Sequence, residues 1–498
     1  MTVSQQLQPA RRYEEQARTR AEQAPRPAFH LAPLTGWMND PNGFSRYGGQ
    51  YHLFYQYYPY AAHWDDMHWG HAVSQDLLHW TPMPCALAPD ESYDRAGCFS
   101  GSAIELEDGR HLLMYTGVQK ERTPDQEETI LQTQILAVGD GTDYEKLADG
   151  PVLTAADLPQ ECTAADFRDP KLWRTETGTY LCVTGCCDDA HDGRIVLFES
   201  PDAFHWQFRS VLIRNNGRFG RMWECPDFFP LDGQWVLLTS PQDMREQEGG
   251  YHCGNGNLCL IGSFDEETGQ FTPEHDQPVD EGLDFYATQT IQTEDGRRVM
   301  IAWMQNWDTL SIREPDAPWM GQMTLPRELS VRNGRLIQQP VRELETLYRE
   351  TLSYQDQRIS GAVRFDGITG RQLDLELELR PEEGTTYRAF TLHFAEDADE
   401  ETYCLLRVCP GEQSVTMDRI HSGTRRALVH SRTCTVPACG EGHIRLRLIL
   451  DRFSAELFIN DGEQTMSMTF YTPMEAQGIT FACEGTARID LTAHIISE

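Results

Sequence analysis

Short apolar runs that follow a glycine turn recur along the first two thirds of the chain. The turn glycines Gly49, Gly109, Gly178, Gly233 and Gly296 stand 60, 69, 55 and 63 residues apart. The five segments that share this plan are GGQYHLFYQ, DGRHLLMYTG, TGTYLCVTG, DGQWVLLTS and DGRRVMIAWM. Apolar runs entered through Asp-Gly or Gly-Gly turns are typical of β-hairpins. Their regular spacing indicates one structural unit repeated five times.

A second repeat supports this interpretation. SQDLLHW at 74–80 and SPDAFHW at 200–206 lie 126 residues apart, which is the length of two such units. Units of this length hold about four strands each, and radial repetition leaves few open sheet edges. We therefore predict an all-β fold with a five-bladed β-propeller over residues 28–340.

The flanking segments have different patterns. Residues 1–27 carry alternating charges and end near two prolines, which predicts a solvated N-terminal helical extension. Residues 341–354 are expected to form a linker. In RQLDLELELRP and GHIRLRLILDRFSAELFINDGE, apolar and polar positions alternate with period two, so we predict a β-sandwich domain over 355–498. This domain could stabilise the propeller, form a homo-oligomer, or contact the far end of a long substrate.

Charge and cysteine content narrow the class of protein. The formal net charge of -35 argues against nucleic acid and anionic membrane surfaces as partners. The N-terminus has no apolar core and no apolar run is long enough to span a bilayer, so a cytoplasmic location is expected. The 14 cysteines are accordingly expected to be reduced, and the pair Cys186-Cys187 and the Cys434 to Cys439 spacing to be structural.

Polar residues recur at one phase of the repeat. Nine residues before the turn glycines stand Asp40 in WMNDP, Ser100 in CFSGS, Asp169 in FRDP and Glu224 in WECPD, whereas Asp284 in DFYA lies twelve before its glycine. Alone, Asp40 has the sequence context of a turn residue. One phase of a propeller repeat comes from the equivalent strand of every blade, however, so all of these side chains can face the central axis, and Asp40, Asp169 and Glu224 are predicted to meet there.

Three converging carboxylates have two chemical interpretations. Oxygen ligands could hold calcium or magnesium. Flat aromatic side chains at the same phases suit a sugar ring better than a hydrated ion, and two carboxylates in unlike environments are the groups that glycoside hydrolysis needs. We therefore predict neither a metal nor a cofactor. Cys225 could be taken for a thiol nucleophile, but no histidine base stands at its phase. The aromatic residues are Trp37, Trp64, Phe99, Trp223, Tyr286 and Trp303.

With these motifs in this order, together with WGHAVSQDLLHW, the chain resembles glycoside hydrolase family 32 from about residue 29 to 327. The resemblance implies a propeller followed by a β-sandwich, and a β-fructofuranosidase that acts on sucrose, sucrose 6-phosphate or short fructo-oligosaccharides. It implies that Asp40 is the nucleophile, Glu224 the general acid/base and Asp169 a stabiliser of the transition state. The fructose pocket is then expected to contain Trp37, Asn39, Gln56, Trp64, Phe99, Ser100, Arg168, Cys225, Tyr286 and Trp303.

The mechanism sets requirements for these residues. Arg168 is expected to orient Asp169 and keep it ionised. Glu224 has to hold a proton near neutral pH, which burial beside Trp223 and the two aspartates could achieve. Two other functions remain open from the sequence: a fructosyltransferase that uses the same covalent intermediate, and a non-catalytic carbohydrate-binding propeller.

Overall fold

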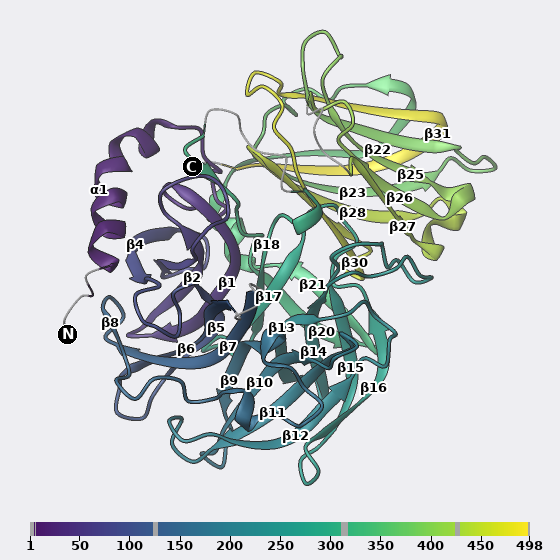
Figure 1. Cartoon of the computed structure of the whole chain (residues 1–498). Helices are drawn as coiled ribbons and strands as arrows, with labels where there is room; N and C mark the ends of the chain where they lie inside the picture. Colours follow the sequence, from purple (N-terminus) through teal and green to yellow (C-terminus); the bar gives the residue numbers. More distant parts are fainter. Residues whose placement is uncertain (1–3, 5, 123–127, 310–316, 424–428, 497–498) are drawn as a thin grey trace.

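The computed structural model describes residues 4, 6–122, 128–309, 317–423 and 429–496. It has two parts, a ring of small sheets and a larger C-terminal sheet (Figure 1). The α-helix α1 (Leu7–Gln23) packs against β4 on the outside of the ring. The all-β fold with a five-bladed propeller and a C-terminal sandwich is thus confirmed within these residues.

Each blade is an antiparallel meander whose first strand is innermost. The blades are β1 (Gly36–Tyr47), β2 (Gln50–Tyr58), β3 (His68–Ser74) and β4 (Trp80–Leu87); β5 (Cys98–Glu105), β6 (His111–Arg122), β7 (Glu128–Gly139) and β8 (Tyr144–Lys146); β9 (Arg168–Arg174), β10 (Tyr180–Cys187), β11 (Gly193–Ser200) and β12 (Gln207–Arg214); β13 (Trp223–Leu231), β14 (Gln234–Pro241), β15 (Leu258–Asp265) and β16 (Gln270–Gln277); β17 (Tyr286–Gln292), β18 (Arg298–Trp303), β20 (Arg327–Arg332) and β21 (Arg335–Pro340).

The ring closes through a short strand from the end of the propeller. β19 (Trp319–Met320) pairs in parallel with β1, with Gly36 opposite Trp319 and Trp37 opposite Met320. The innermost strands contact one another in chain order, and β17 contacts β1 again. Because all five innermost strands surround one axis, residues far apart in sequence come together there.

In every innermost strand, a β-bulge near the beginning interrupts the regular pairing with the second strand of the same blade. A bulge redirects side chains and is common beside active sites. Asp169, Cys225 and Ala287 take positive φ values of 66°, 48° and 55° in three of these bulges. The bulges lie between Met38 and Pro41, Phe99 and Gly101, Arg168 and Lys171, Glu224 and Asp227, and Tyr286 and Gln289.

The C-terminal sheet folds over itself. Its longest strand, β31, pairs with β24 through its first half and with β23 through its second, while β22 pairs along both halves. Two leaves therefore share β31 and β22 and enclose an apolar core. The strands are β22 (Tyr348–Val363), β23 (Leu373–Pro381), β24 (Ala389–Glu396), β25 (Cys404–Cys409), β26 (Ser414–Asp418), β27 (Ser431–Thr435), β28 (Ile444–Asp451), β29 (Ser454–Ile459), β30 (Gln464–Thr469) and β31 (Gly478–Ile496).

The period-two pattern of the sequence is visible in β23. Leu375, Leu377 and Leu379 are buried, while Glu376 and Glu378 between them are exposed. The range 341–354, where a linker was expected, contains a 3-10 helix (Arg342–Leu347) and the beginning of β22. Further 3-10 turns occupy Ala155–Asp157, Ala164–Asp166, Trp307–Thr309, Pro410–Glu412 and Pro437–Glu441.

Buried ion pairs join the two parts. Arg327 of the propeller is fully buried and lies 2.5 Å from Oε2 of Glu456 and 3.0 Å from Oδ2 of Asp280. Asp284 accepts hydrogen bonds from Arg419 and, at 2.7 Å, from the backbone N–H of Thr469. The expectation that Asp284 faces the axis is therefore wrong, because the residue nine positions before Gly296, which occupies the bulge, is Ala287.

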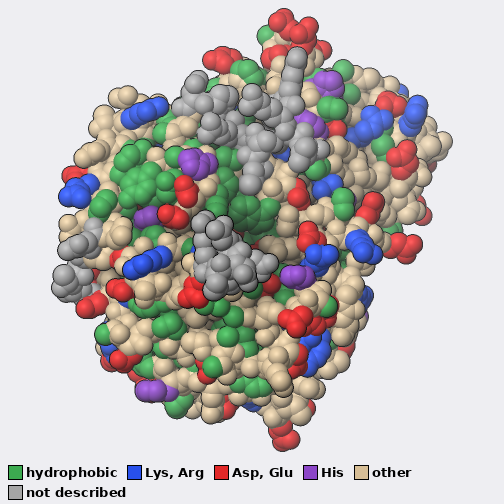
Figure 2. Space-filling view, viewed as in Figure 1, with side chains coloured by type: hydrophobic (Ala, Val, Ile, Leu, Met, Phe, Trp, Pro, Cys, Tyr) green, Lys and Arg blue, Asp and Glu red, His purple; other side chains and the backbone are tan. Residues whose placement is uncertain are grey.

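Many of the acidic side chains that give the chain its net negative charge lie at the surface. Figure 2 shows acidic side chains on both parts of the molecule, with basic side chains between them. No helix in the described part of the chain is long and apolar enough to cross a membrane.

Candidate active site

Asp40 lies in the bulge of β1, one of the five innermost strands that surround the propeller axis. Its Oδ2 accepts a hydrogen bond from the Ser100 hydroxyl at 2.7 Å, and its Oδ1 accepts one from the Asn39 amide at 2.9 Å. Trp37 Nε1 in turn donates to Asn39 Oδ1 at 2.7 Å, which fixes the orientation of that amide. Burial and the nearby charge of Glu224 raise the pKa of Asp40, while the bonds from Ser100 and Asn39 oppose this rise. The carboxylate is rigidly held, yet partly exposed.

Asp169 lies in the bulge of β9 and is buried. Its Oδ2 accepts a hydrogen bond from the backbone N–H of Cys225 at 2.9 Å, and its own N–H donates to the Thr116 hydroxyl at 3.0 Å. Burial raises its pKa to about 7, with a smaller contribution from the charge of Glu224 and in spite of the opposing charge of Arg168. Arg168 was expected to keep Asp169 ionised; its charge does lower the pKa of Asp169, but the cost of burying the carboxylate is larger.

Glu224 begins the bulge of β13 and has a different set of partners. Its Oε1 accepts hydrogen bonds from both Nε and Nη2 of Arg168, each at 3.1 Å, and its Oε2 lies 2.6 Å from the Tyr286 hydroxyl. Arg168 was expected to orient Asp169, but the nearest oxygen of Asp169 lies 3.9 Å from its Nε. Nη1 of Arg168 also donates to Oδ1 of Asp166 at 2.8 Å. The guanidinium therefore orients Glu224 more directly than Asp169.

Cys225 lies between the carboxylates. Its sulfur is 3.6 Å from Asp40 Oδ2 and 3.7 Å from Asp169 Oδ2. Burial, followed by the charges of Asp169, Asp40 and Glu224, raises its pKa well above the ordinary value. A thiol in this setting stays protonated and is a poor nucleophile. The structure thus brings Asp40, Asp169 and Glu224 together around Cys225, as the phase of the repeat predicts.

Most of the expected aromatic residues gather beside the carboxylates. Trp37, Tyr286 and Trp303 are buried in one cluster with Cys225, and the rings of Trp37 and Trp303 meet edge to face at 5.9 Å. Trp64 is 41% exposed and its ring packs edge-on against Phe99 at 6.1 Å, so these two rings form the solvent-exposed edge of the aromatic cluster.

Two other expected residues lie behind this layer or away from it. Gln56 is buried, and its amide donates to the Cys98 carbonyl at 2.9 Å rather than to a carboxylate. Trp223 packs in a different cluster, where its indole N–H donates to the Phe219 carbonyl at 2.8 Å. Successive residues of a strand point to opposite sides, so a strand that directs Glu224 toward the axis directs Trp223 away from it.

Several neighbours of the site were missed by sequence reasoning. Trp307 stacks with Trp37 at 6.3 Å, and Met320 belongs to the same cluster. Both follow the fifth turn glycine, so the repeat phase gave no signal for them. Asp166 stands two residues before Arg168 and could have been recognised as a charge partner in the motif.

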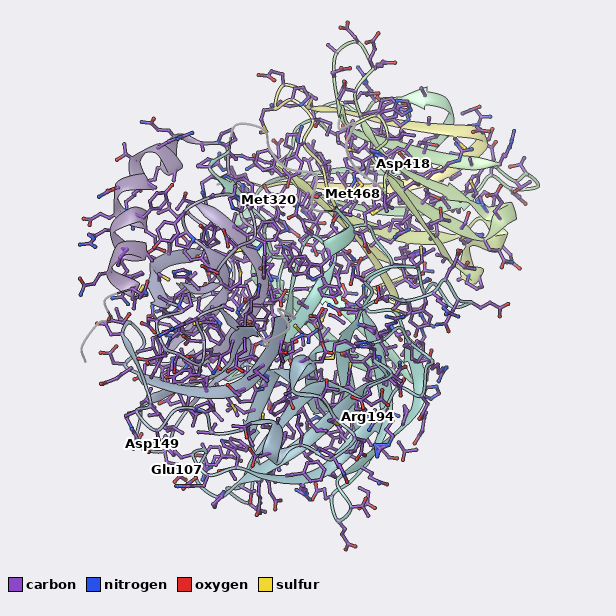
Figure 3. All side chains as sticks on the ribbon, viewed as in Figure 1. Glu107, Asp149, Arg194, Met320, Asp418 and Met468 are labelled. Atoms are coloured by element: carbon purple, nitrogen blue, oxygen red, sulfur yellow. The ribbon has the colours of Figure 1, made fainter. Side chains whose placement is uncertain are left out.

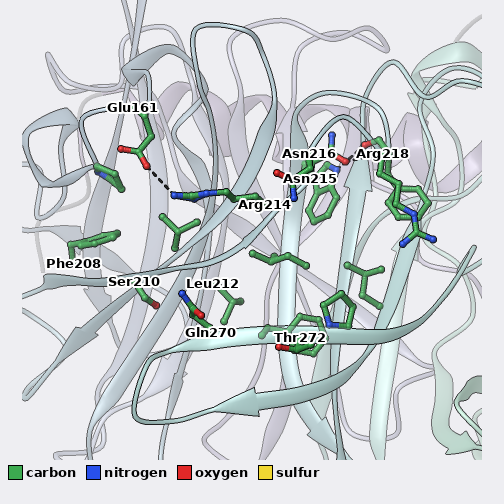
Figure 4. A pocket seen from close by; sticks show the side chains of 18 residues that line it. Glu161, Phe208, Ser210, Leu212, Arg214, Asn215, Asn216, Arg218, Gln270 and Thr272 are labelled. Atoms are coloured by element: carbon green, nitrogen blue, oxygen red, sulfur yellow. Dashed lines mark hydrogen bonds and ion pairs between the residues drawn. The ribbon is translucent and has the colours of Figure 1, made fainter.

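Other cavities and clusters do not coincide with this site. A cavity of about 880 Å³ lies between the outer strands β12 and β16, and none of the three carboxylates lines it (Figure 4). Over the described ranges, no group of three or more histidine, cysteine, aspartate or glutamate side chains is arranged to hold a metal ion.

The fold and the site together define a glycoside hydrolase with carboxylates in unlike environments at the axis of a propeller. Profiles of the glycosyl hydrolases family 32 N-terminal and C-terminal domains match residues 30–340 and 343–496. The chain belongs to glycosyl hydrolase family 32.

Relatives and solved structures agree with this assignment. The chain is 37% identical to a sucrose-6-phosphate hydrolase of Zymomonas mobilis, over 93% of this chain and 90% of that protein. It is 36% identical to a raffinose invertase of Escherichia coli, over 93% of each chain. A variant of a Bombyx mori GH32 β-fructofuranosidase, solved in complex with sucrose, superposes with a TM-score of 0.82 at 31% identity, covering 99% of this chain and 98% of that one.

Proposed function

We propose that the protein is a retaining β-fructofuranosidase in which Asp40 is the nucleophile and Glu224 the general acid/base. The observation that carries this assignment is the difference between their surroundings. Asp40 accepts hydrogen bonds from the neutral side chains of Ser100 and Asn39, whereas Glu224 is bonded to Arg168 and Tyr286. Two carboxyl groups with different environments can take different protonation states, which a double displacement requires.

In the first step Asp40 attacks the anomeric carbon of the fructosyl unit. The bonds from Ser100 and Asn39 hold its carboxylate in one orientation, so little reorganisation is needed before attack. The C–O bond to the leaving group breaks as the proton of Glu224 passes to the leaving oxygen. A fructosyl-enzyme and the released sugar result.

In the second step Glu224 removes a proton from water, which attacks the fructosyl-enzyme and frees Asp40. The transition states of both steps carry positive charge on the sugar ring. Asp169 lies beside Asp40, on the other side of the Cys225 sulfur, and its ionised form would stabilise this charge or hold the ring hydroxyls.

The Tyr286 hydroxyl can hydrogen-bond Glu224 both when Glu224 is protonated and when it is ionised. This hydroxyl lies 2.6 Å from Glu224 Oε2 and 3.1 Å from the Ser240 carbonyl, but it has only one hydrogen to donate. When Glu224 is protonated, the phenol can accept that proton's hydrogen bond and donate to Ser240. When Glu224 is ionised, the phenol can turn and donate to it. Both states of the acid/base are therefore accommodated.

The substrate class follows from the relatives, whose names include sucrose-6-phosphate hydrolase and raffinose invertase. We propose sucrose, sucrose 6-phosphate or a short fructo-oligosaccharide as the substrate. Fructose release from sucrose, sucrose 6-phosphate and kestose should be measured side by side, with NMR of the first product. We expect fructose release from at least one of these three substrates, with retained anomeric configuration. A first product with inverted configuration would contradict the assignment of Asp40 as the nucleophile.

We also propose a cytoplasmic location, supported by the 14 free thiols, which are typical of reducing compartments. Oligomerisation through the sandwich stays a prediction.

A further inference from the structure

Two thiols outside the active site lie in direct contact. The sulfur of Cys162 is 2.9 Å from the sulfur of Cys186, and the residues are 24 positions apart in sequence. Cys162 is half-buried in the loop before β9, and Cys186 is buried near the end of β10. The backbones are held together beside them, because the N–H of Thr163 donates to the Cys187 carbonyl at 2.9 Å. A disulfide bond is about 2.05 Å long, so less than about 1 Å of approach is needed.

The two sulfurs differ in reactivity. The hydrogen bond from Cys186 lowers the pKa of Cys162, and the positive charge of Arg194 acts in the same direction. Contact with Cys162 and burial raise the pKa of Cys186. Arg194, labelled in Figure 3, also lies 3.4 Å from Glu161, the neighbour of Cys162. A partly accessible thiol whose pKa is lowered beside a cation is the usual setting of a redox-active cysteine, and Cys186 is positioned as its resolving partner.

We propose that Cys162 and Cys186 form a reversible disulfide that tethers the loop before β9 to β10. The oxidant is a small disulfide such as oxidised glutathione. The Cys162 thiolate attacks one of its sulfurs and releases one glutathione thiolate. Cys186 then gives up its proton and attacks the Cys162 sulfur, which releases the second glutathione thiolate. Two protein thiols are oxidised, one small disulfide is reduced, and the protons end on the two glutathione thiols.

The tether acts on a segment that reaches the active site. Four residues after Cys162, Asp166 bonds Arg168 at 2.8 Å, and Arg168 holds Glu224. On the other side of Cys162, Glu161 accepts a hydrogen bond from Arg214 at 3.1 Å at the edge of the cavity shown in Figure 4. A crosslink at Cys162 therefore fixes the loop between these contacts. It also constrains the unfolded chain, which favours the folded state.

The bond can be tested by peptide mapping. The reduced protein is exposed to oxidised glutathione, quenched with an alkylating agent and digested under non-reducing conditions. We expect a linked peptide that contains Cys162 and Cys186 and lacks two hydrogens. Exposed Cys253 is expected to carry only glutathione or the alkylating agent, and C253S is the matched control that keeps the link. If Cys253 reacts while Cys162 and Cys186 stay alkylated and unlinked, the proposal is overturned.

Heat inactivation tests the tether, and only this readout rests on the proposed function. The oxidised protein should melt a few degrees higher and lose fructose-releasing activity more slowly on heating than the reduced protein. This difference should vanish in C162S and in C186A, and C162S suffices if the buried substitution prevents folding. A linked protein with an unchanged melting temperature would overturn the tether. If the protein proved not to release fructose, the linked peptide and the shift in melting temperature would still be expected.

Discussion

The Tyr286 hydroxyl lies 2.6 Å from Glu224 Oε2 and 3.1 Å from the Ser240 carbonyl. Tyr286 comes from β17 and Glu224 from β13, the innermost strands of adjacent blades. The general acid of the proposed mechanism is therefore positioned by a side chain of the next blade.

The first prediction concerns this contact. Tyr286→Phe removes the hydroxyl and keeps the ring, so it should lower kcat on sucrose by about 10-fold to 100-fold, the usual cost of losing a hydrogen bond to a charged group. The loss should be smaller on β-fructosyl fluoride, whose leaving group needs little protonation. Steady-state kinetics on both donors measure it. Tyr251→Phe, which loses a bond to Asp276 rather than to one of the three site carboxylates, is the control and should stay close to wild type.

The second prediction separates the two catalytic carboxylates. Glu224→Ala should be nearly inactive on sucrose but should still form the fructosyl-enzyme from β-fructosyl fluoride, and added azide should speed its release. Asp40→Ala should be inactive on both donors, because a better leaving group cannot replace a missing nucleophile. Fluoride release and azide dependence give the readout. Rescue of Asp40→Ala instead of Glu224→Ala would reverse the two roles.

The third prediction concerns the pH dependence set by Asp169. Its pKa is raised to about 7, so kcat/KM should fall as the pH drops through about 7 and Asp169 takes up a proton. The charge of Arg168 lowers this pKa, and Arg168→Gln should therefore move the acidic limb of the profile to higher pH. It should also reduce kcat/KM at the optimum by about 10-fold to 100-fold, because Glu224 loses a charged partner.

Arg174→Gln is a matched control on the same strand, where Arg174 pairs with Glu107 at the surface. Its profile should coincide with that of the wild type. An acidic limb that stays in place in Arg168→Gln would show that Asp169 does not govern it.

The fourth prediction concerns stability. His30 is buried between Asp451 at 2.8 Å and Glu456 at 2.9 Å. Burial by itself lowers its pKa, but the hydrogen bonds and charges of the two carboxylates together outweigh burial and raise the pKa from 6.5 to about 9. A raised pKa means that the folded state binds the proton more tightly, so the stabilisation is complete below about pH 6.5 and is lost as the pH rises through about 9. The melting temperature should fall across this window.

His30→Gln leaves Asp451 without its cation and Glu456 with Arg327 as its remaining cation, and it should cost about 3 to 5 kcal/mol near pH 6. Its melting temperature should vary less between pH 6.5 and 9 than that of the wild type. His79→Gln, which alters an exposed pair with Asp76, is the control and should keep the wild-type dependence. An unchanged pH dependence in His30→Gln would contradict the assignment.

The repeat in the sequence determined the five blades and the place of the site. Asp40, Ser100, Asp169 and Glu224 lie in or at the edge of the bulges of their blades, and each stands nine residues before its turn glycine. Local chemistry sets this offset, because the turn needs glycine and the strand needs an apolar run. The period-two pattern determined the sandwich for a similar reason, since one face of each strand has to be buried.

The tertiary structure alone decided which partners these residues have. Arg168 donates hydrogen bonds to Glu224 and lies farther from Asp169, and Asp284 bonds Arg419 of the other domain, because both arrangements depend on how separate sheets pack. The raised pKa of Asp169 has the same origin: Asp169 is buried beside two carboxylates from other blades, and the effect of burial outweighs that of the adjacent cation. A sequence period records distances along one chain, whereas these energies depend on distances between strands that are remote in that chain.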